Sequence, residues 1–433
     1  TDHTAIFPKL KGFIEGQLSA WKPEHALSFY VAMEHVSKRY GVELAQFKEM
    51  AKQTLSEQAA GASSPDIQDW QTDMLFAVLD SMETLQIDLS SEGKDLRLLM
   101  TDTAKAGTAF AKLLASSQGQ VSSLSGTIPA NAWFSTSAIL DVRENDDYGR
   151  LNEMSIRTYT DLLGMDSEKM KGLEPLIRES AQLTTGDSAF SLYTDGEFPV
   201  AMHTVAKVSD VKAFRAVNKK LIALLVPEVW KLVVEELKSN GTELPPAQVG
   251  TIAEMVALAK PFATPMGLVP TLSSSETDGV VVDALELQVD WTVLSREMGL
   301  AAQDVDAVNM LKAIAGEKLV FAVASGSDRY VQAFGPNAIE TAKMLAKGDN
   351  PKSSDAVNAL SKDKNWTLVI RAGALLNALS FAPDLAAKKP LIEAISKERM
   401  ISITAKSTGS AVECALEVPL DLIGQIMTLA SAP

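Results

Sequence analysis

The stretch 188-SAFSLYTDGEFPVAMHTVAKVSD-210 is typical of a β-hairpin. Apolar side chains alternate with small or polar ones on both sides of Asp195-Gly196, and an Asp-Gly pair between two such runs predicts a tight turn. His203 falls in the second predicted strand. The first question is therefore whether this histidine serves a function or belongs to a scaffold.

The same pattern occurs four more times in the chain. Most copies are followed by a helical pattern with a plausible start, such as Ser209 or Asp210 before residues 211–221, Thr108 before Phe110, and Pro336 in a segment that stops at Gly348. The sequence thus predicts a recurring hairpin-then-helix unit. The four further hairpins span residues 84–102 with a turn at Gly93, 268–291 at Gly279, 318–335 at Gly326, and 400–420 at Gly409.

The spacing of the turns indicates an internal repeat. Gly196 and Gly279 are 83 residues apart, and so are Gly326 and Gly409. Gly93 precedes Trp133 by 40 residues, as Gly326 precedes Trp366, and both tryptophans open a lone predicted strand. Residues 26–36 resemble a third such strand. Self-similarity at a fixed period is the sequence signature of repeated architectures.

The predicted fold class is α+β, with antiparallel hairpins forming sheets whose one face is covered by helices. The body is expected to be elongated or divided into two or three similar lobes. We expect three units, at residues 1–126, 127–300 and 301–433, with Ser116–Gly126 as a flexible loop or lobe boundary. Further helices are predicted within residues 159–181, 229–240, 245–263 and 375–397.

Composition narrows the classes of function. The 433 residues are 46% hydrophobic and 22% charged, which suits large packed cores, and the net charge of −15 disfavours a nucleic-acid groove or docking to anionic lipid by charge. The longest purely aliphatic run, Leu221–Val226, is too short to span a membrane. Thr1 stands where Met would begin a chain, so we expect a removed leader or a trimmed end.

The hairpin-helix pattern also resembles that of a known group of proteins. Hairpin-helix units whose lone strands are entered by Pro-Ala-Asn-Ala-Trp (129–133) or Asp-Lys-Asn-Trp (363–366) resemble those of large bacterial envelope proteins that have no assigned chemistry. The resemblance extends over Ala26–Leu429. It implies an exported protein, in the periplasm or cell envelope and often lipid-anchored, and it carries over no site residues.

Motifs for catalysis or cofactors are missing from the sequence. It has no Gly-x-Ser-x-Gly elbow, no phosphate-binding glycine loop and no His-Glu-x-x-His helix, and Cys414 as the single cysteine allows no internal disulfide. We therefore expect no cofactor and no metal, and the catalytic residues, if any, stay unknown. His25 and His35, each beside a glutamate, are more typical of strand ends than of a metal site.

The single residues that could carry a function are also better explained by structural roles. His203 is expected to be a hydrogen-bonded or edge histidine, and Cys414 a core thiol. The acidic loop 141–153 carries Glu144, Asn145, Asp146, Asp147 and Glu153 as candidate calcium ligands, but a solvated turn is favoured. Tryptophans at strand starts or ends suggest packing corners, with sugar stacking as the alternative; these are Trp133, Trp291 and Trp366.

Methionines suggest one binding function. They are adaptable, so they could line a pocket for acyl chains between a sheet and its helices, although ordinary core filling is the simpler interpretation. The leading hypothesis is a non-enzymatic, exported carrier or sensor for a lipid-like or apolar ligand. The alternatives are a structural or protein-docking component of the envelope and an enzyme without a local motif. The methionines considered are Met100, Met202, Met266, Met298, Met310, Met344 and Met427.

Overall fold

The computed structural model describes most of the chain. The described residues are 27–58, 72–73, 76–92, 94–140, 167–196, 198–239, 249–297, 308, 312, 316–380, 385 and 388–431.

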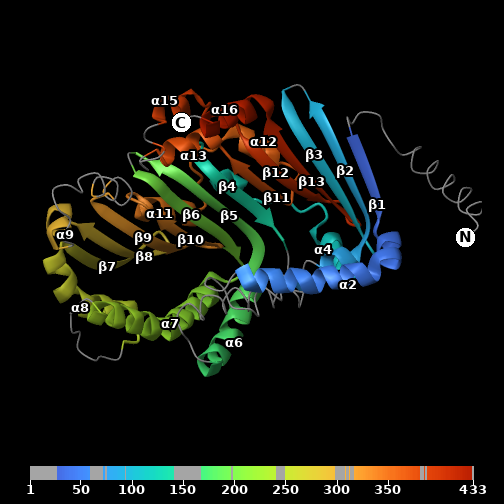
Figure 1. The fold of residues 1–433 in the computed structure, drawn as a ribbon. Helices are drawn as coiled ribbons and strands as arrows, with labels where there is room; N and C mark the ends of the chain where they lie inside the picture. The colour runs from blue at the N-terminus through green and yellow to red at the C-terminus, as the bar shows by residue number, and fades with distance from the viewer. Residues whose placement is uncertain are drawn as a thin grey trace, which may run out of the picture.

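One large antiparallel sheet organises these residues, in the order β1-β2-β3-β13-β12-β11-β4-β5-β6-β10-β9-β8-β7 (Figure 1). Every pair of neighbouring strands is antiparallel. The strands are β1 Leu27–Ala32, β2 Met82–Glu92, β3 Asp95–Ala104, β4 Ala132–Ile139, β5 Thr184–Asp195, β6 Phe198–Val208, β7 Leu268–Thr277, β8 Val280–Val289, β9 Lys318–Ser325, β10 Arg329–Phe334, β11 Trp366–Ile370, β12 Ile401–Ser407 and β13 Ala411–Pro419.

All five predicted hairpins are present, as the pairs β2/β3, β5/β6, β7/β8, β9/β10 and β12/β13. The α+β class is thereby confirmed. Strands from the first and last predicted units lie next to each other, since β3 pairs with β13. The middle unit pairs with the last one where β6 meets β10 and β8 meets β9. The three unit boundaries themselves stay a prediction.

Helices lie on both sides of the sheet (Figure 1). In chain order they are α2 Met33–Gln58, α4 Ala109–Ser117, α6 Ser167–Leu183, α7 Val211–Ser239, α8 Ile252–Ala263, α9 Trp291–Glu297, α11 Ala338–Lys347, α12 Asp355–Ser361, α13 Ala372–Ala378, α15 Lys389–Ala394 and α16 Leu420–Ser431, with short 3-10 turns η2 Ser125–Thr127 and η3 Thr264–Met266.

The two faces of the sheet differ in side-chain size. On the covered face, small residues such as Ala189, Ala322 and Ala333 pack under Leu124 and the buried side of α11. Small side chains let a helix approach a sheet closely, which explains the tight core there. On the other face, large side chains such as Phe190 and Leu192 remain half-buried, and Phe321 is 39% exposed. Phe190, Leu192 and Phe321 thus lie on the more open face.

Helix α7 is longer than the sequence suggests. Asp210 caps it by accepting a hydrogen bond from the Ala213 backbone N–H at 2.9 Å, as predicted. The helix then continues through Pro227 to Ser239, so the separate helix expected after Pro227 is wrong. Proline lacks the backbone N–H that a helix uses, but packing of Val226 and Trp230 against α8 can hold the two halves together.

The segment Ser116–Gly126, expected to be flexible, is instead anchored. The carboxylate of Asp187 on β5 accepts hydrogen bonds from the hydroxyls of Ser122 and Ser123, both at 2.6 Å, and from the Ser123 backbone N–H at 3.0 Å. Leu124 is completely buried in the core. Serine and glycine content alone does not show that a loop is mobile when its polar groups have buried partners.

Replacing Asp187 by alanine should therefore loosen this loop. Three donors would lose one charged, buried acceptor, which should lower the free energy of unfolding by about 3 kcal/mol. Urea unfolding gives the energy, and limited proteolysis within residues 116–126 gives the location. Exposed Asp349 offers the control. If D187A is no less stable than D349A, the anchoring role is wrong.

Candidate functional site

The described residues form an open groove of about 740 Å³ at one end of the sheet. Its walls come from the second half of α7, the last turn of α8, η3 and the start of the edge strand β7. The lining residues are Leu232, Val233, Glu235, Ala259, Phe262, Ala263, Met266 and Leu268.

Local sequence explains how the walls are held. Helix α8 starts at a capping box, in which Thr251 and Glu254 satisfy each other's backbone N–H groups. Helices α7 and α8 then pack through buried Trp230 and half-buried Phe262 and their neighbours. These contacts fix the two helical walls relative to one another.

Gly267 connects the helical wall to the strand. Its φ of 80° lies in the left-handed region, and a Cβ there would lie 2.7 Å from the Asp290 carbonyl oxygen. Only glycine fits this approach without strain. The chain can therefore turn directly from Met266 into β7, which places Met266 and Leu268 in one wall.

The lining of the groove is almost entirely apolar. Of the lining residues that the structure describes, seven of eight are apolar, and Glu235 is the one ionisable residue among these eight. Such walls provide dispersion contacts and exclude water, with one polar group that can orient a ligand. The volume lies within the range of about 300–1,000 Å³ that is usual for small-molecule sites.

The predicted methionines are dispersed, and Met266 alone lies among the groove-lining residues. Met100 and Met202 are half-buried in strands, Met344 packs against the core under α11, and Met427 is 66% exposed on α16. Met298 and Met310 lie outside the described residues. A pocket lined by many methionines is therefore absent from the described part of the chain.

His203 lies inside the sheet and not at an edge, because β6 has β5 on one side and β10 on the other. It is 1% exposed, opposite Ser191 of β5 and Ala333 of β10, with its ring centroid 5.4 Å from that of Tyr193. Neither ring nitrogen has a partner of full hydrogen-bond geometry among the described residues. Burial lowers the pKa of His203 to about 4, against a weaker opposite effect of the Thr127 backbone. The imidazole is thus neutral near pH 7.

The remaining candidate residues do not converge. Cys414 is half-buried on β13, where burial and then Asp102 raise the pKa of its thiol. His35 lies on α2, far in sequence from His203 and from Cys414. His3, His25 and the acidic loop 141–153 lie outside the described residues. Within the described ranges, no group of three or more His, Cys, Asp or Glu side chains is placed to hold a metal ion.

The tryptophans act as packing corners where the structure describes them. The Trp366 indole donates to the Thr136 hydroxyl at 2.9 Å, and the Trp291 indole donates to the Gly316 carbonyl at 2.6 Å. Trp133 is buried at the start of β4. Side chains held inward in this way do not form a sugar-stacking strip.

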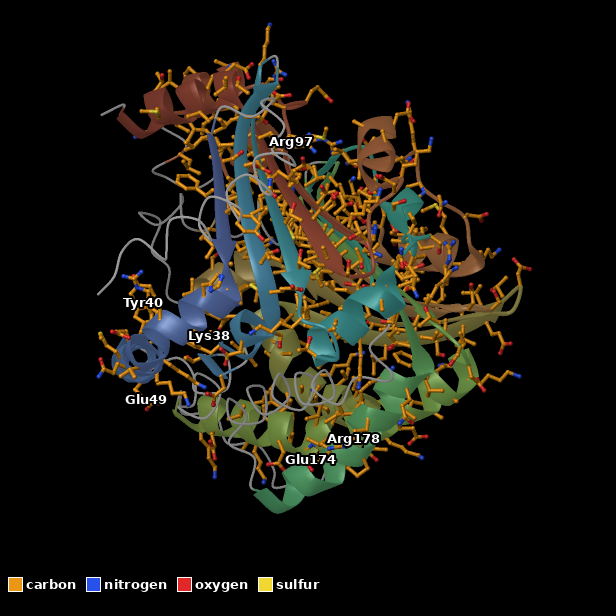
Figure 2. All side chains as sticks on the ribbon, turned by 90° about the vertical axis from the view of Figure 1, so that its right-hand side faces the viewer. Lys38, Tyr40, Glu49, Arg97, Glu174 and Arg178 are labelled. Atoms are coloured by element: carbon orange, nitrogen blue, oxygen red, sulfur yellow. The ribbon has the colours of Figure 1, made fainter. Side chains whose placement is uncertain are left out.

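Charged side chains on the outer elements are dispersed as well. Figure 2 shows Lys38 and Glu49 on α2, Glu174 and Arg178 together on α6, and Arg97 well apart from them on β3. They form no single charged site. None of the helices within the described ranges is long and apolar enough to cross a membrane.

The described chain is thus an α+β protein with one broad antiparallel sheet and an apolar groove at its β7 end. No protein-family model matches the sequence, and no curated protein is significantly similar to it. One solved structure, crystal form IV of TP0453, aligns with 71% of this chain and 97% of its own at 7% identity. The TM-score of 0.23 is too low to indicate a shared fold.

Proposed function

We propose that the protein binds a lipid-like or other apolar molecule in the groove between α7, α8 and β7, and that it acts as a carrier or sensor without catalysing a reaction. The observation that carries this proposal is the groove itself, with seven apolar side chains and one carboxylate around about 740 Å³. An acyl chain suits such walls because each buried methylene contributes about 0.8 kcal/mol.

The proposed cellular location is the bacterial envelope. We infer an exported protein from the resemblance of its hairpin-helix pattern and lone-strand entries at 129–133 and 363–366. An apolar carrier suits that compartment, where lipids must cross water between membranes.

We also infer that the chain contains an internal repeat. The order of elements supports it: a lone strand, a helical segment, a hairpin and a helix follow one another from β1, again from β4, and again from β11. The equal spacings of 83 residues between turn glycines relate a different set of hairpins, β5/β6 to β7/β8 and β9/β10 to β12/β13, so this inference rests on the order of elements. The hairpin β7/β8 lies outside this repeated order, and helix α8 connects it to α7. The groove between α7, α8 and β7 therefore lies where the chain departs from the repeat.

Filling the groove should weaken ligand binding. Ala263 lines the groove at the end of α8, so A263W would place an indole where the ligand lies. We expect at least a tenfold weaker affinity for the neutral apolar fluorophore N-phenyl-1-naphthylamine, measured by fluorescence titration. Ala257 is exposed on the same helix and does not line the groove, so A257W is the matched control.

Native mass spectrometry of protein purified without denaturation complements this titration. A discrete added mass above 46.4 kDa that dissociates as a lipid would support the carrier. Absence of saturable fluorophore binding to the unaltered protein, or equal binding by A263W and A257W, would show that the groove is not the ligand site.

A further inference from the structure

Strand β7 forms one edge of the sheet, and no described strand pairs with its outer side. Among the described strands it pairs only with β8, in one continuous register from Leu268 to Thr277. Pro270 is buried near its start, while all residues from Thr271 to Thr277 are exposed. Edge strands are usually blocked by lysine, proline or a bulge, because their unpaired N–H and C=O groups invite another strand. Residues 271–277 contain no lysine, proline or bulge, and Glu276 is their one charged residue.

The exposed stretch is close to a palindrome. It reads Thr-Leu-Ser-Ser-Ser-Glu-Thr, with Ser274 at its centre and threonine at both ends. When two identical strands pair antiparallel about Ser274, Thr271 lies opposite Thr277 and Ser273 opposite Ser275. Residues opposite each other then lie on the same face, as an antiparallel pair requires, and hydroxyl pairs of this kind are favourable.

We propose that β7 docks onto β7 of a second copy of this chain, centred on Ser274, so that the two sheets join edge to edge. This interface is separate from the ligand groove and goes beyond the proposed binding function. A two-fold axis through the strand pair makes the contact self-complementary and closed, which gives a dimer and not a fibre.

Charge and packing agree with this register. Glu276 lies opposite Leu272 of the second copy, and the two Glu276 side chains are about 14 Å apart along the strands. That distance exceeds the Debye length of about 8 Å at physiological salt, so their repulsion is small. Asp283, beside Ser274 on β8, is already neutralised by Arg215 at 2.6 Å. Helix α8 contacts the start of β7, and the seven paired residues lie beyond it.

A cysteine at the centre tests the register. In the full chain with Cys414 replaced by serine, Ser274→Cys should form a disulfide between copies under mild oxidation, since opposed Cα atoms lie about 4.5–5.5 Å apart and a disulfide spans about 4.4–6.8 Å. Ser273→Cys is the matched control, because its own symmetry mate lies about 8 Å away. Non-reducing electrophoresis should show several-fold more dimer for Ser274→Cys.

Sedimentation velocity of the unaltered protein provides a second measurement. It should show a species of about twice 46.4 kDa that S273K/S275K, which sets lysine opposite lysine on exposed positions, converts to monomer. A monomer at all concentrations up to about 100 μM, or equal cross-linking at positions 273 and 274, would overturn the proposal and leave the edge to a strand of another protein. Fluorophore binding by S273K/S275K should stay unchanged, which separates this test from that of the groove.

Discussion

Replacing Gly326 by alanine should lower the free energy of unfolding by about 3 kcal/mol or more. Gly326 follows β9 in the turn to β10, and a Cβ there would lie 1.8 Å from the carbonyl oxygen of Ala346. The backbone fixes the position of the Cβ, and the atom it meets is a backbone oxygen, so no side-chain rotation can relieve the contact. The β9/β10 turn would have to move away from the end of α11, whose residues Leu345 and Ala346 are buried in the core.

Urea unfolding of G326A followed by circular dichroism measures this loss. Gly424 on α16 has nothing within 4 Å of an added Cβ and no unusual φ, so it offers the control. G424A should be as stable as the unaltered protein or more stable by up to about 1 kcal/mol, because alanine favours helix more than glycine does. Equal stabilities of G326A and G424A would show that the close approach to α11 does not constrain the fold.

The second large effect concerns His203 and acid. Its pKa is about 4 in the folded protein against 6.5 for an ordinary histidine, so the unfolded chain binds a proton that the folded chain resists. Burial of neutral His203 therefore leaves the free energy of unfolding undiminished above about pH 6.5. As the pH falls from 6.5 through about 4, protonation of the unfolded chain lowers this free energy. The loss over this window should reach about 3 kcal/mol. Urea unfolding at steps between pH 7 and pH 4 would follow it.

His203→Leu isolates this contribution, because leucine has a similar volume and does not titrate. The difference in unfolding free energy between the two proteins should shift in favour of H203L as the pH falls. Carboxylates with lowered pKa values, such as Asp73, whose pKa the Lys48 and Lys52 ammonium groups lower, titrate in both proteins and cancel in the difference. A difference that stays constant from pH 7 to pH 4 would contradict the role assigned to buried His203.

Both residues depend on contacts between distant parts of the chain. The neighbours of Gly326 predict a turn, but Ala346, whose carbonyl oxygen leaves no room for a Cβ there, is 20 residues further along the chain. The alternating pattern around His203 predicts a strand, yet its position inside the sheet depends on β10 pairing alongside β6. Contacts made by the folding of distant segments leave no local pattern.

The five hairpins, several helix starts and the α+β class can be predicted from the sequence, because alternation, Asp-Gly turns and caps act within a few residues. Contacts between distant segments join the hairpins in one sheet, anchor Ser116–Gly126 on Asp187, and bring α7 and α8 to β7 around a groove. The apolar residues of both helices could be seen in the sequence, but their partners could not. The packing of these elements depends on the burial and hydrogen bonding of residues that are far apart in the chain. Such residues come into contact only when the chain folds, so no local pattern in the sequence predicts their contacts.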